Sequence, residues 1–197
     1  MTALPIVETM AGDISAYIPT NVISITDGQI YLETELFHAG IRPAVNVGLS
    51  VSRVGRAAQH EAMKKVSGSM RLDVAQYREM AVFAQFGSDI DSSTKQMLER
   101  GARLVELTKQ PQDNTLSLAE QVAILIAYRK GVFDGIAIRG VTGHQWELLE
   151  FLSGACGRAM AQINATGKLS DEDRSELEHA MELFAAQTEA GQDAEHK

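Results

Sequence analysis

Gly40-Ile41-Arg42-Pro43-Ala44-Val45-Asn46-Val47-Gly48-Leu49-Ser50-Val51-Ser52-Arg53-Val54-Gly55 is the stretch that decides how the first part of the chain folds. Small or apolar residues alternate with polar ones through its middle, and this period of two predicts a strand. Pro43 lies near the strand's start, where its missing backbone N–H does least harm. Arg53 ends the strand before a glycine turn, so we expect its guanidinium at the rim of a sheet. Ligands bind at that rim in open α/β sheets, although an isolated arginine more often pairs with a carboxylate.

The residues before this stretch predict a small α/β piece. We expect strands at residues 2–9 and Gln29–Glu33, and helices at Tyr17–Ile25 and Thr34–Ala39. Thr20 or Asn21 is the expected N-cap of the first helix, because side-chain oxygens there accept from free backbone N–H groups. Gly40 is expected to end the second helix in the left-handed conformation.

The residues after Gly55 predict helices only. Apolar residues recur every three or four positions in long segments, and two capping boxes mark helix starts at Ser93 and Ser117. The expected helices are Met63–Ala81, one from Ser93 through Val105, one from Ser117 through Tyr128, Trp146–Ile163 and Ser170–Phe184, with a frayed end at Ala190–Lys197. The fold class is therefore mainly α, with a short α/β piece at residues 1–58 and a helical bundle at 59–197.

Composition excludes several classes of protein. The 197 residues are 45% hydrophobic and 22% charged, which is ordinary for a globular chain. No apolar run is long enough to span a membrane, and residues 1–20 lack the pattern of a signal peptide. The single cysteine, Cys156, allows no internal disulfide and fits a reducing compartment.

Charge is unevenly distributed along the chain. The formal net charge is −8, yet Arg42–Arg78 holds seven bases and two acids, while Asp171–Lys197 holds nine acids and two bases. The basic segment surrounds Arg53 and favours an anionic ligand. An acidic chain with 6% aromatic residues gives no indication of nucleic-acid binding.

Several common motifs are missing from the sequence. The phosphate-binding loop Gly-x-x-x-x-Gly-Lys-Ser/Thr is absent, and Gly167-Lys168-Leu169 lacks its hydroxyl residue and upstream glycine. The five histidines never occur at the spacing of metal ligands, so we expect no metal site. The acids Asp171–Asp173 are explained by the start of a helix, where negative charge is favourable.

The stretch ending in Val51-Ser52-Arg53-Val54-Gly55 resembles the alpha subunit of F-type ATP synthases, as do Ala11–Ile30 and Ala62-Met63-Lys64-Lys65-Val66. The resemblance runs from residue 2 to about residue 110 and continues more weakly afterwards. It implies that residues 1–58 are a remnant of a P-loop-type nucleotide-binding domain and that residues 59–197 are the C-terminal helical domain.

The resemblance implies a catalytic role for three residues. Arg53 stands where that family has an arginine finger, which completes the catalytic site of an adjacent beta subunit. Ser24 and Gly28 match positions that face the same site. Taken without the family, Ser24 and Gly28 are explained equally well as turn residues.

The resemblance also implies an incomplete adenine pocket built by Arg42, Pro43, Gln110 and Gln112. Two departures bear on this region. Asp113-Asn114 follows where the family has an aromatic residue, and Arg56 stands where glycine is usual.

The family implies a non-catalytic, regulatory subunit in proton-driven ATP synthesis, with beta, gamma and delta subunits as partners. It implies ATP or ADP with Mg²⁺ in the complete subunit, and a peripheral place on the cytoplasmic side of a bacterial inner membrane. For this chain alone we expect weak or no nucleotide binding, because the phosphate loop is missing. The alternative function is an inactive fragment or a helical binding module without nucleotide binding. A free-standing nucleotide hydrolase is disfavoured. The sequence leaves open whether protons or sodium ions drive the complex.

Overall fold

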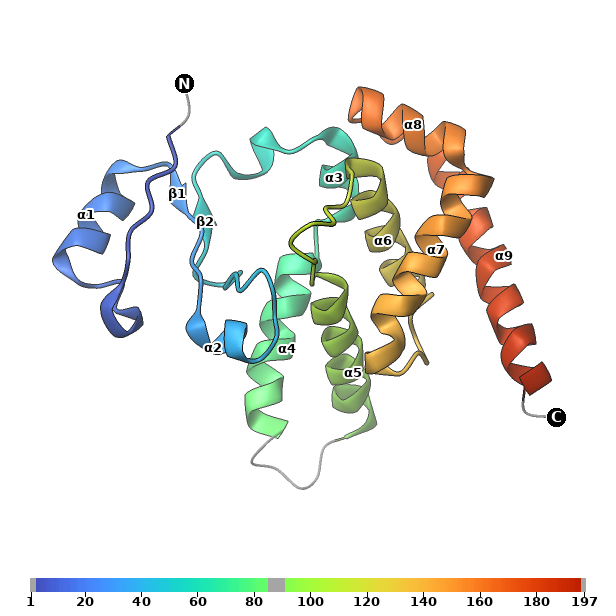
Figure 1. Ribbon diagram of the computed structural model, residues 1–197, viewed down its shortest axis with the longest axis horizontal. Coiled ribbons are helices and arrows are strands. Elements are labelled where there is room, and N and C mark those ends of the chain that lie inside the picture. The colour runs from blue at the N-terminus through green and yellow to red at the C-terminus, as the bar shows by residue number, and fades with distance from the viewer. Residues whose placement is uncertain (1–2, 85–90, 196–197) are drawn as a thin grey trace. The chain divides into compact units, whose positions relative to one another are not determined.

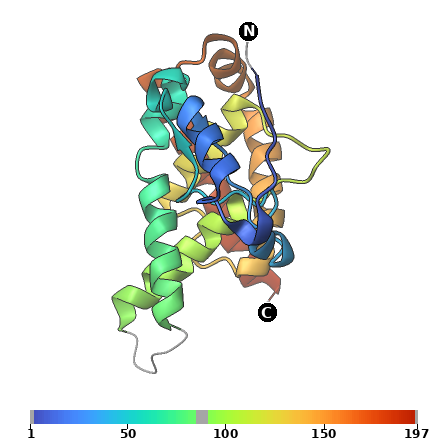
Figure 2. The ribbon, with the colours of Figure 1, turned by 90° about the vertical axis from the view of Figure 1, so that its left-hand side faces the viewer.

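The computed structural model describes residues 3–84 and 91–195, with side chains up to Thr188. The chain divides into two compact units, Met1–Ala58 and Gln59–Lys197, here called unit 1 and unit 2. Figures 1 and 2 show the ribbon of each unit in two views.

Unit 1 contains short elements only. They are the 3-10 helices η1 (Met10–Gly12) and η2 (Gly55–Ala58), the helices α1 (Tyr17–Ile25) and α2 (Thr34–His38), and the strands β1 (Gly28–Gln29) and β2 (Val51–Ser52). The two strands pair antiparallel, with Gly28 opposite Ser52 and Gln29 opposite Val51. An isolated bridge between Leu32 and Val45 extends this contact between the two segments.

Most of the strands expected in unit 1 are wrong. Residues 3–9 form no regular structure, and the expected strands at Gln29–Glu33 and before Arg53 shrink to two residues each. A strand needs a neighbour for its backbone groups, and within the described residues a continuous ladder forms only between β1 and β2, followed by the isolated bridge at Leu32 and Val45. Helix α2 is confirmed, and Gly40 after it has the expected positive φ of 76°.

The expected N-cap of α1 is also wrong. The helix begins at Tyr17, so Thr20 and Asn21 lie inside it. Pro19 falls in the first turn, where a missing N–H is tolerated. The Asn21 amide donates to the Tyr17 carbonyl one turn earlier, at 2.8 Å, instead of capping.

Unit 1 buries almost none of its apolar side chains. Among its described residues, Pro19 and Ala44 alone are buried. Ile6 is 99% exposed and Met10 is 88% exposed, and several more large apolar side chains lie open to solvent: Leu4, Tyr17, Ile18, Ile25, Ile30 and Leu32. Hydrophobic burial therefore contributes little to holding unit 1, which depends on backbone hydrogen bonds instead.

Unit 2 is a helical bundle built around one central helix. Its elements are α3 (Glu61–Val66), α4 (Met70–Ala84), α5 (Ser92–Leu107), α6 (Leu118–Lys130), η3 (Ile138–Gly140), α7 (Val141–Ala155), α8 (Gly157–Thr166) and α9 (Asp171–Glu195). Helix α6 packs against α3, α7, α8 and α9, and α5 packs against α4 and α7 (Figure 1). Every residue from 122 to 128 is buried. A helix that is apolar on all sides has to lie inside a core, and α6 does.

The core of unit 2 is continuous. Its largest fully buried side chains include Phe133, Leu104, Leu148, Leu152, Ile163 and Leu177. Polar contacts fix the helix ends around this core. The capping box at the start of α6 is confirmed, because the Ser117 hydroxyl accepts from the Glu120 N–H at 3.4 Å and the Glu120 carboxylate accepts from the Ser117 N–H at 2.6 Å.

Two helices expected to be continuous are broken. The segment Met63–Ala81 divides into α3 and α4 at Ser67–Ser69, and Trp146–Ile163 divides into α7 and α8 at Cys156. Gly68 and Gly157 lie at these breaks, and glycine is a poor helix former. The apolar spacing continues in phase across both breaks, which is why periodicity predicted single helices.

The two ends of the helical region differ from expectation as well. Asp91, not Ser93, caps α5, because its carboxylate accepts from the Thr94 N–H at 2.9 Å. Helix α9 continues to Glu195, whereas fraying was expected from Ala190 onward. No helix in the described part of the chain is long and apolar enough to cross a membrane.

His144 is a titratable group inside the core of unit 2. Its ring lies 5.8 Å from the ring centroid of Phe133 and 5.0 Å from that of Phe184, and the residue is 8% exposed. Burial lowers the pKa of His144 below its ordinary value of 6.5, and the nearby Glu147 carboxylate opposes this only in part. The folded state therefore favours the neutral imidazole.

This burial predicts a loss of stability in mild acid. Well above pH 6.5 the imidazole is neutral in both the folded and the unfolded state, so the free energy of unfolding does not depend on its protonation. As the pH falls through 6.5, the unfolded chain takes up the proton first, and the free energy of unfolding decreases. We expect urea unfolding to show a smaller loss of stability between pH 7.5 and pH 5 in His144→Gln than in the unchanged chain. His179→Gln, at an exposed site in α9, is the control and should keep the full loss. Equal losses in all three proteins would contradict the prediction.

Candidate functional site

Arg53 lies directly after β2, where its backbone is held against the segment between α1 and β1. The Arg53 N–H donates to the Asp27 carbonyl at 2.7 Å, which continues the pairing of β1 with β2 by one residue. The Arg53 side chain is exposed, and within the described residues it makes no hydrogen bond or ion pair. Arg53 therefore pairs with no carboxylate in the part of the chain that the structure describes, although the sequence allowed that alternative.

Gly28 permits the close approach of the two strands. Its φ is 144°, and a Cβ added there would lie 2.2 Å from the Val51 carbonyl oxygen and 2.8 Å from the Ser52 Cα. No side chain fits such a space, so β1 and β2 can pair in this register only with glycine at this position. Gly28 thereby places the backbone from which Arg53 projects.

Ser24 lies in the last turn of α1 and points its hydroxyl back to the helix. The Ser24 hydroxyl donates to the Asn21 carbonyl at 2.7 Å, and the residue is exposed. Thr26 then links the helix to β1, because its hydroxyl lies 2.8 Å from the Val22 carbonyl and 3.2 Å from the Gly28 carbonyl. One region of unit 1 thus contains all three expected catalytic residues, and it is formed by the end of α1, by β1 and by the end of β2. The catalytic roles of these residues stay predictions.

Ser52 makes a contact in this region that sequence reasoning missed. Its hydroxyl accepts from the Gly55 N–H at 2.9 Å, across the residue pair Arg53-Val54. The signal was present in the sequence as Ser-x-x-Gly, the spacing at which a serine caps the start of a helical turn. The 3-10 helix η2 starts at this Gly55.

The four residues expected to line an adenine pocket fall in both units. In unit 1 the Arg42 guanidinium lies over the Phe37 ring, 4.1 Å from its centroid, and Pro43 follows it through a cis peptide bond. In unit 2 Gln110 is half-buried and Gln112 is exposed, in the segment after α5. Its expected residues are divided between the two units, and the adenine pocket stays a prediction.

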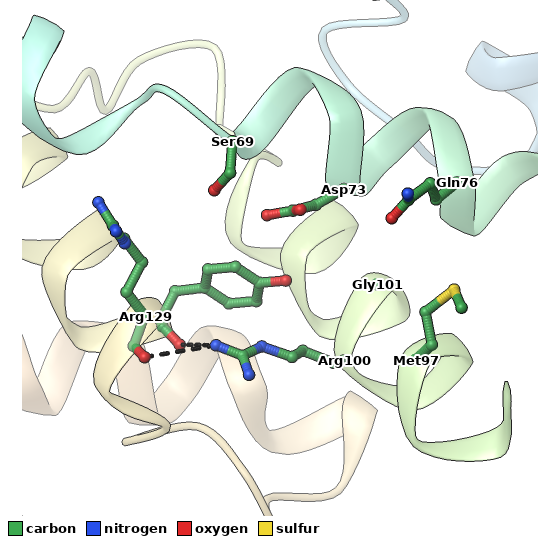
Figure 3. Close-up of a pocket in the computed structure, with 8 residues that line it drawn as sticks. Ser69, Asp73, Gln76, Met97, Arg100, Gly101 and Arg129 are labelled. Atoms are coloured by element: carbon green, nitrogen blue, oxygen red, sulfur yellow. Dashed lines mark hydrogen bonds between the residues drawn. The ribbon is translucent and has the colours of Figure 1, made fainter. Parts of the chain in front are cut away.

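A cavity of about 300 Å³ lies in unit 2 between α4, α5 and α6. Figure 3 shows Ser69 and Asp73 on one side of it and Arg100 on the other. The Arg100 guanidinium donates to the carbonyls of Tyr128 and Arg129, both at 3.3 Å, and lies 5.0 Å from the centroid of the Tyr128 ring. No expected site residue lines this cavity.

The polar groups of this cavity have a structural explanation. Arg100 satisfies carbonyls in the last turn of α6, where a positive charge is favourable. Burial, together with the charge of Asp73, raises the pKa of Tyr128, so its phenol stays protonated at neutral pH. Among the described residues there is also no group of three histidines, cysteines or acids placed to hold a metal ion.

Comparison with known proteins explains the division into two units. Residues 1–52 match the ATP synthase alpha/beta family, nucleotide-binding domain, and residues 59–184 match the ATP synthase alpha/beta chain, C terminal domain. The chain is 57% identical over 181 residues to ATP synthase subunit alpha of Lawsonia intracellularis (strain PHE/MN1-00), a match that covers 92% of this chain and 36% of that subunit. The chain thus spans about a third of the length of this relative. The resemblance seen in the sequence is confirmed: this chain belongs to the ATP synthase alpha/beta family.

Proposed function

We propose that this chain acts as the C-terminal portion of an alpha subunit in an F-type ATP synthase, where Arg53 serves as an arginine finger. The observation that carries the proposal is an exposed guanidinium, without a partner among the described residues, on a backbone fixed by the pairing of β1 with β2. A guanidinium supplied in trans neutralises the charge that develops on a transferring phosphoryl group, an effect of about 10³–10⁵ in rate.

The nucleotide that Arg53 reaches would be held by a neighbouring beta subunit. This sequence contains no phosphate-binding loop, so the chain itself offers no cradle for the terminal phosphate. Ser24 and Gly28 lie in the same region as Arg53 and would face that catalytic site from the alpha side. A small hydroxyl residue and a glycine permit the close approach that such an interface requires.

The wider assignments follow from the family and are part of the same proposal. The complete subunit is regulatory rather than catalytic and binds ATP or ADP with Mg²⁺, with Arg42, Pro43, Gln110 and Gln112 at the adenine. Its partners are the beta, gamma and delta subunits, and the complex carries out proton-driven ATP synthesis on the cytoplasmic side of a bacterial inner membrane. The chain itself meets the membrane only through that complex.

A second candidate function is a helical binding module without nucleotide chemistry. The observation that favours it is the contrast between a bundle with a continuous core and a unit 1 in which large apolar side chains stay exposed. Such a chain keeps a folded bundle even when the nucleotide-binding part is inactive. Measurements on Arg53 and on ATP binding separate the two candidates.

The finger is tested in an assembled ring. The matching segment of the Lawsonia alpha subunit is replaced by this chain, and the chimera is reconstituted with that organism's other ring subunits. We expect Arg53→Ala to lower the ATPase kcat at least 100-fold, about 2.7 kcal/mol of transition-state stabilisation. Arg53→Lys should not restore it, because a lysine lacks the planar fork of donors.

Arg139→Ala is the matched control for the finger, since Arg139 is an exposed arginine of η3 in unit 2. It should leave kcat within twofold of the unchanged chimera. A loss of less than tenfold in Arg53→Ala would contradict the finger assignment.

Nucleotide binding by the chain alone tests the other half of the proposal. Because phosphate contacts dominate nucleotide binding and no phosphate loop is present, equilibrium dialysis should detect no binding of Mg-ATP tighter than millimolar, or about −4 kcal/mol. The complete alpha subunit of the relative is the control and should bind more tightly. Micromolar binding by this chain would overturn the expectation.

A further inference from the structure

The turn that follows β2 is closed by a side chain. The Ser52 hydroxyl accepts from the Gly55 N–H at 2.9 Å, and Gly55 has a φ of 50°, in the left-handed region. Glycine takes this conformation at no steric cost but also leaves it easily. The hydroxyl therefore restrains the start of the turn at Gly55, and a backbone bond from the Ala57 N–H to the Val54 carbonyl at 3.2 Å follows it.

Arg53 lies between two hydrogen bonds that restrain its backbone from both sides. On one side its own N–H is bound by the Asp27 carbonyl at 2.7 Å. On the other side the Ser52–Gly55 contact fixes the path of the chain as it leaves Arg53. Removal of the hydroxyl would leave only the first of these restraints.

The Ser52 side chain has no other task in the described part of unit 1. It is exposed and makes no other hydrogen bond among the described residues. Its cross-strand neighbour is Gly28, which has no side chain to pack against it. Within the described residues Ser52 therefore has no packing role. Its one side-chain hydrogen bond there closes the turn beside Arg53.

We propose that Ser52 is a positioning residue for Arg53, which it serves by closing the turn through its hydroxyl. The inference rests on the proposed function of Arg53 as an arginine finger. Pre-organisation of a catalytic group contributes to rate because a misplacement of about 1 Å can cost 10²-fold. As a positioning residue Ser52 acts through Arg53 alone, so its loss should lower kcat and leave KM unchanged.

The test uses the reconstituted chimeric ring, with assembly of each variant checked by native mass spectrometry. We expect Ser52→Ala to lower the ATPase kcat about tenfold with KM within twofold of the unchanged ring. Ser52→Thr keeps an acceptor oxygen and should restore kcat to within threefold. Ser153→Ala is the control: Ser153 is an exposed serine of α7 whose hydroxyl makes one local hydrogen bond, to the Glu150 carbonyl, and its loss should change neither constant.

The double variant separates positioning from a general structural role. If Ser52 acts through Arg53, Ser52→Ala combined with Arg53→Ala should be no slower than Arg53→Ala alone, because the group being positioned is already gone. Multiplied losses in the double variant would overturn the inference. If the Ser52→Ala ring does not assemble, Ser52→Cys takes its place, because the cysteine side chain has nearly the same shape and its sulfur is only a weak acceptor. A kcat of the Ser52→Cys ring equal to that of the unchanged ring would overturn the inference.

The remaining outcomes distinguish the inference from the function on which it rests. An unchanged kcat in Ser52→Ala together with a large loss in Arg53→Ala overturns the positioning role alone. An unchanged kcat in Arg53→Ala overturns the finger and the positioning role together.

Discussion

Burial of the central helix α6 is the constraint on which the stability of this chain depends. Residues 122–128 are buried without interruption, and α3, α7, α8 and α9 pack around them. Each fully buried valine, leucine or isoleucine side chain contributes about 1.5–3 kcal/mol relative to exposure. Nothing comparable exists in the described part of unit 1, where two small buried residues stand against many exposed apolar ones.

The candidate site lies in the unit without a core, and its geometry is therefore set by the backbone. Gly28 allows β1 and β2 to meet, Asp27 holds the Arg53 N–H, and Ser52 closes the turn behind it. These contacts fix the site locally but give it little stability. Around it the large apolar side chains of unit 1 stay exposed within the described residues.

The sequence predicted the helical fold class from long runs of apolar periodicity, and it predicted the family from long strings of matching residues. It did not predict the breaks at Ser67–Ser69 and Cys156, since the apolar spacing runs through them in phase. Its strands were mostly wrong because a strand depends on a partner, and in the described chain a continuous ladder forms only between β1 and β2. In the site, resemblance pointed to Arg53, Ser24 and Gly28, while the bond between Ser52 and Gly55 was missed although its Ser-x-x-Gly spacing is present in the sequence. The structure adds a steric reason for Gly28, while the catalytic roles stay predictions.

Amide hydrogen exchange of the isolated chain tests most directly whether its stability resides in the bundle core. We predict that the α6 amides exchange at least 100-fold more slowly than those of α1, β1 and β2 once intrinsic rates are corrected, a difference of about 2.7 kcal/mol. Equal protection in both units would contradict it, because unit 1 would then need a core that its described residues do not form.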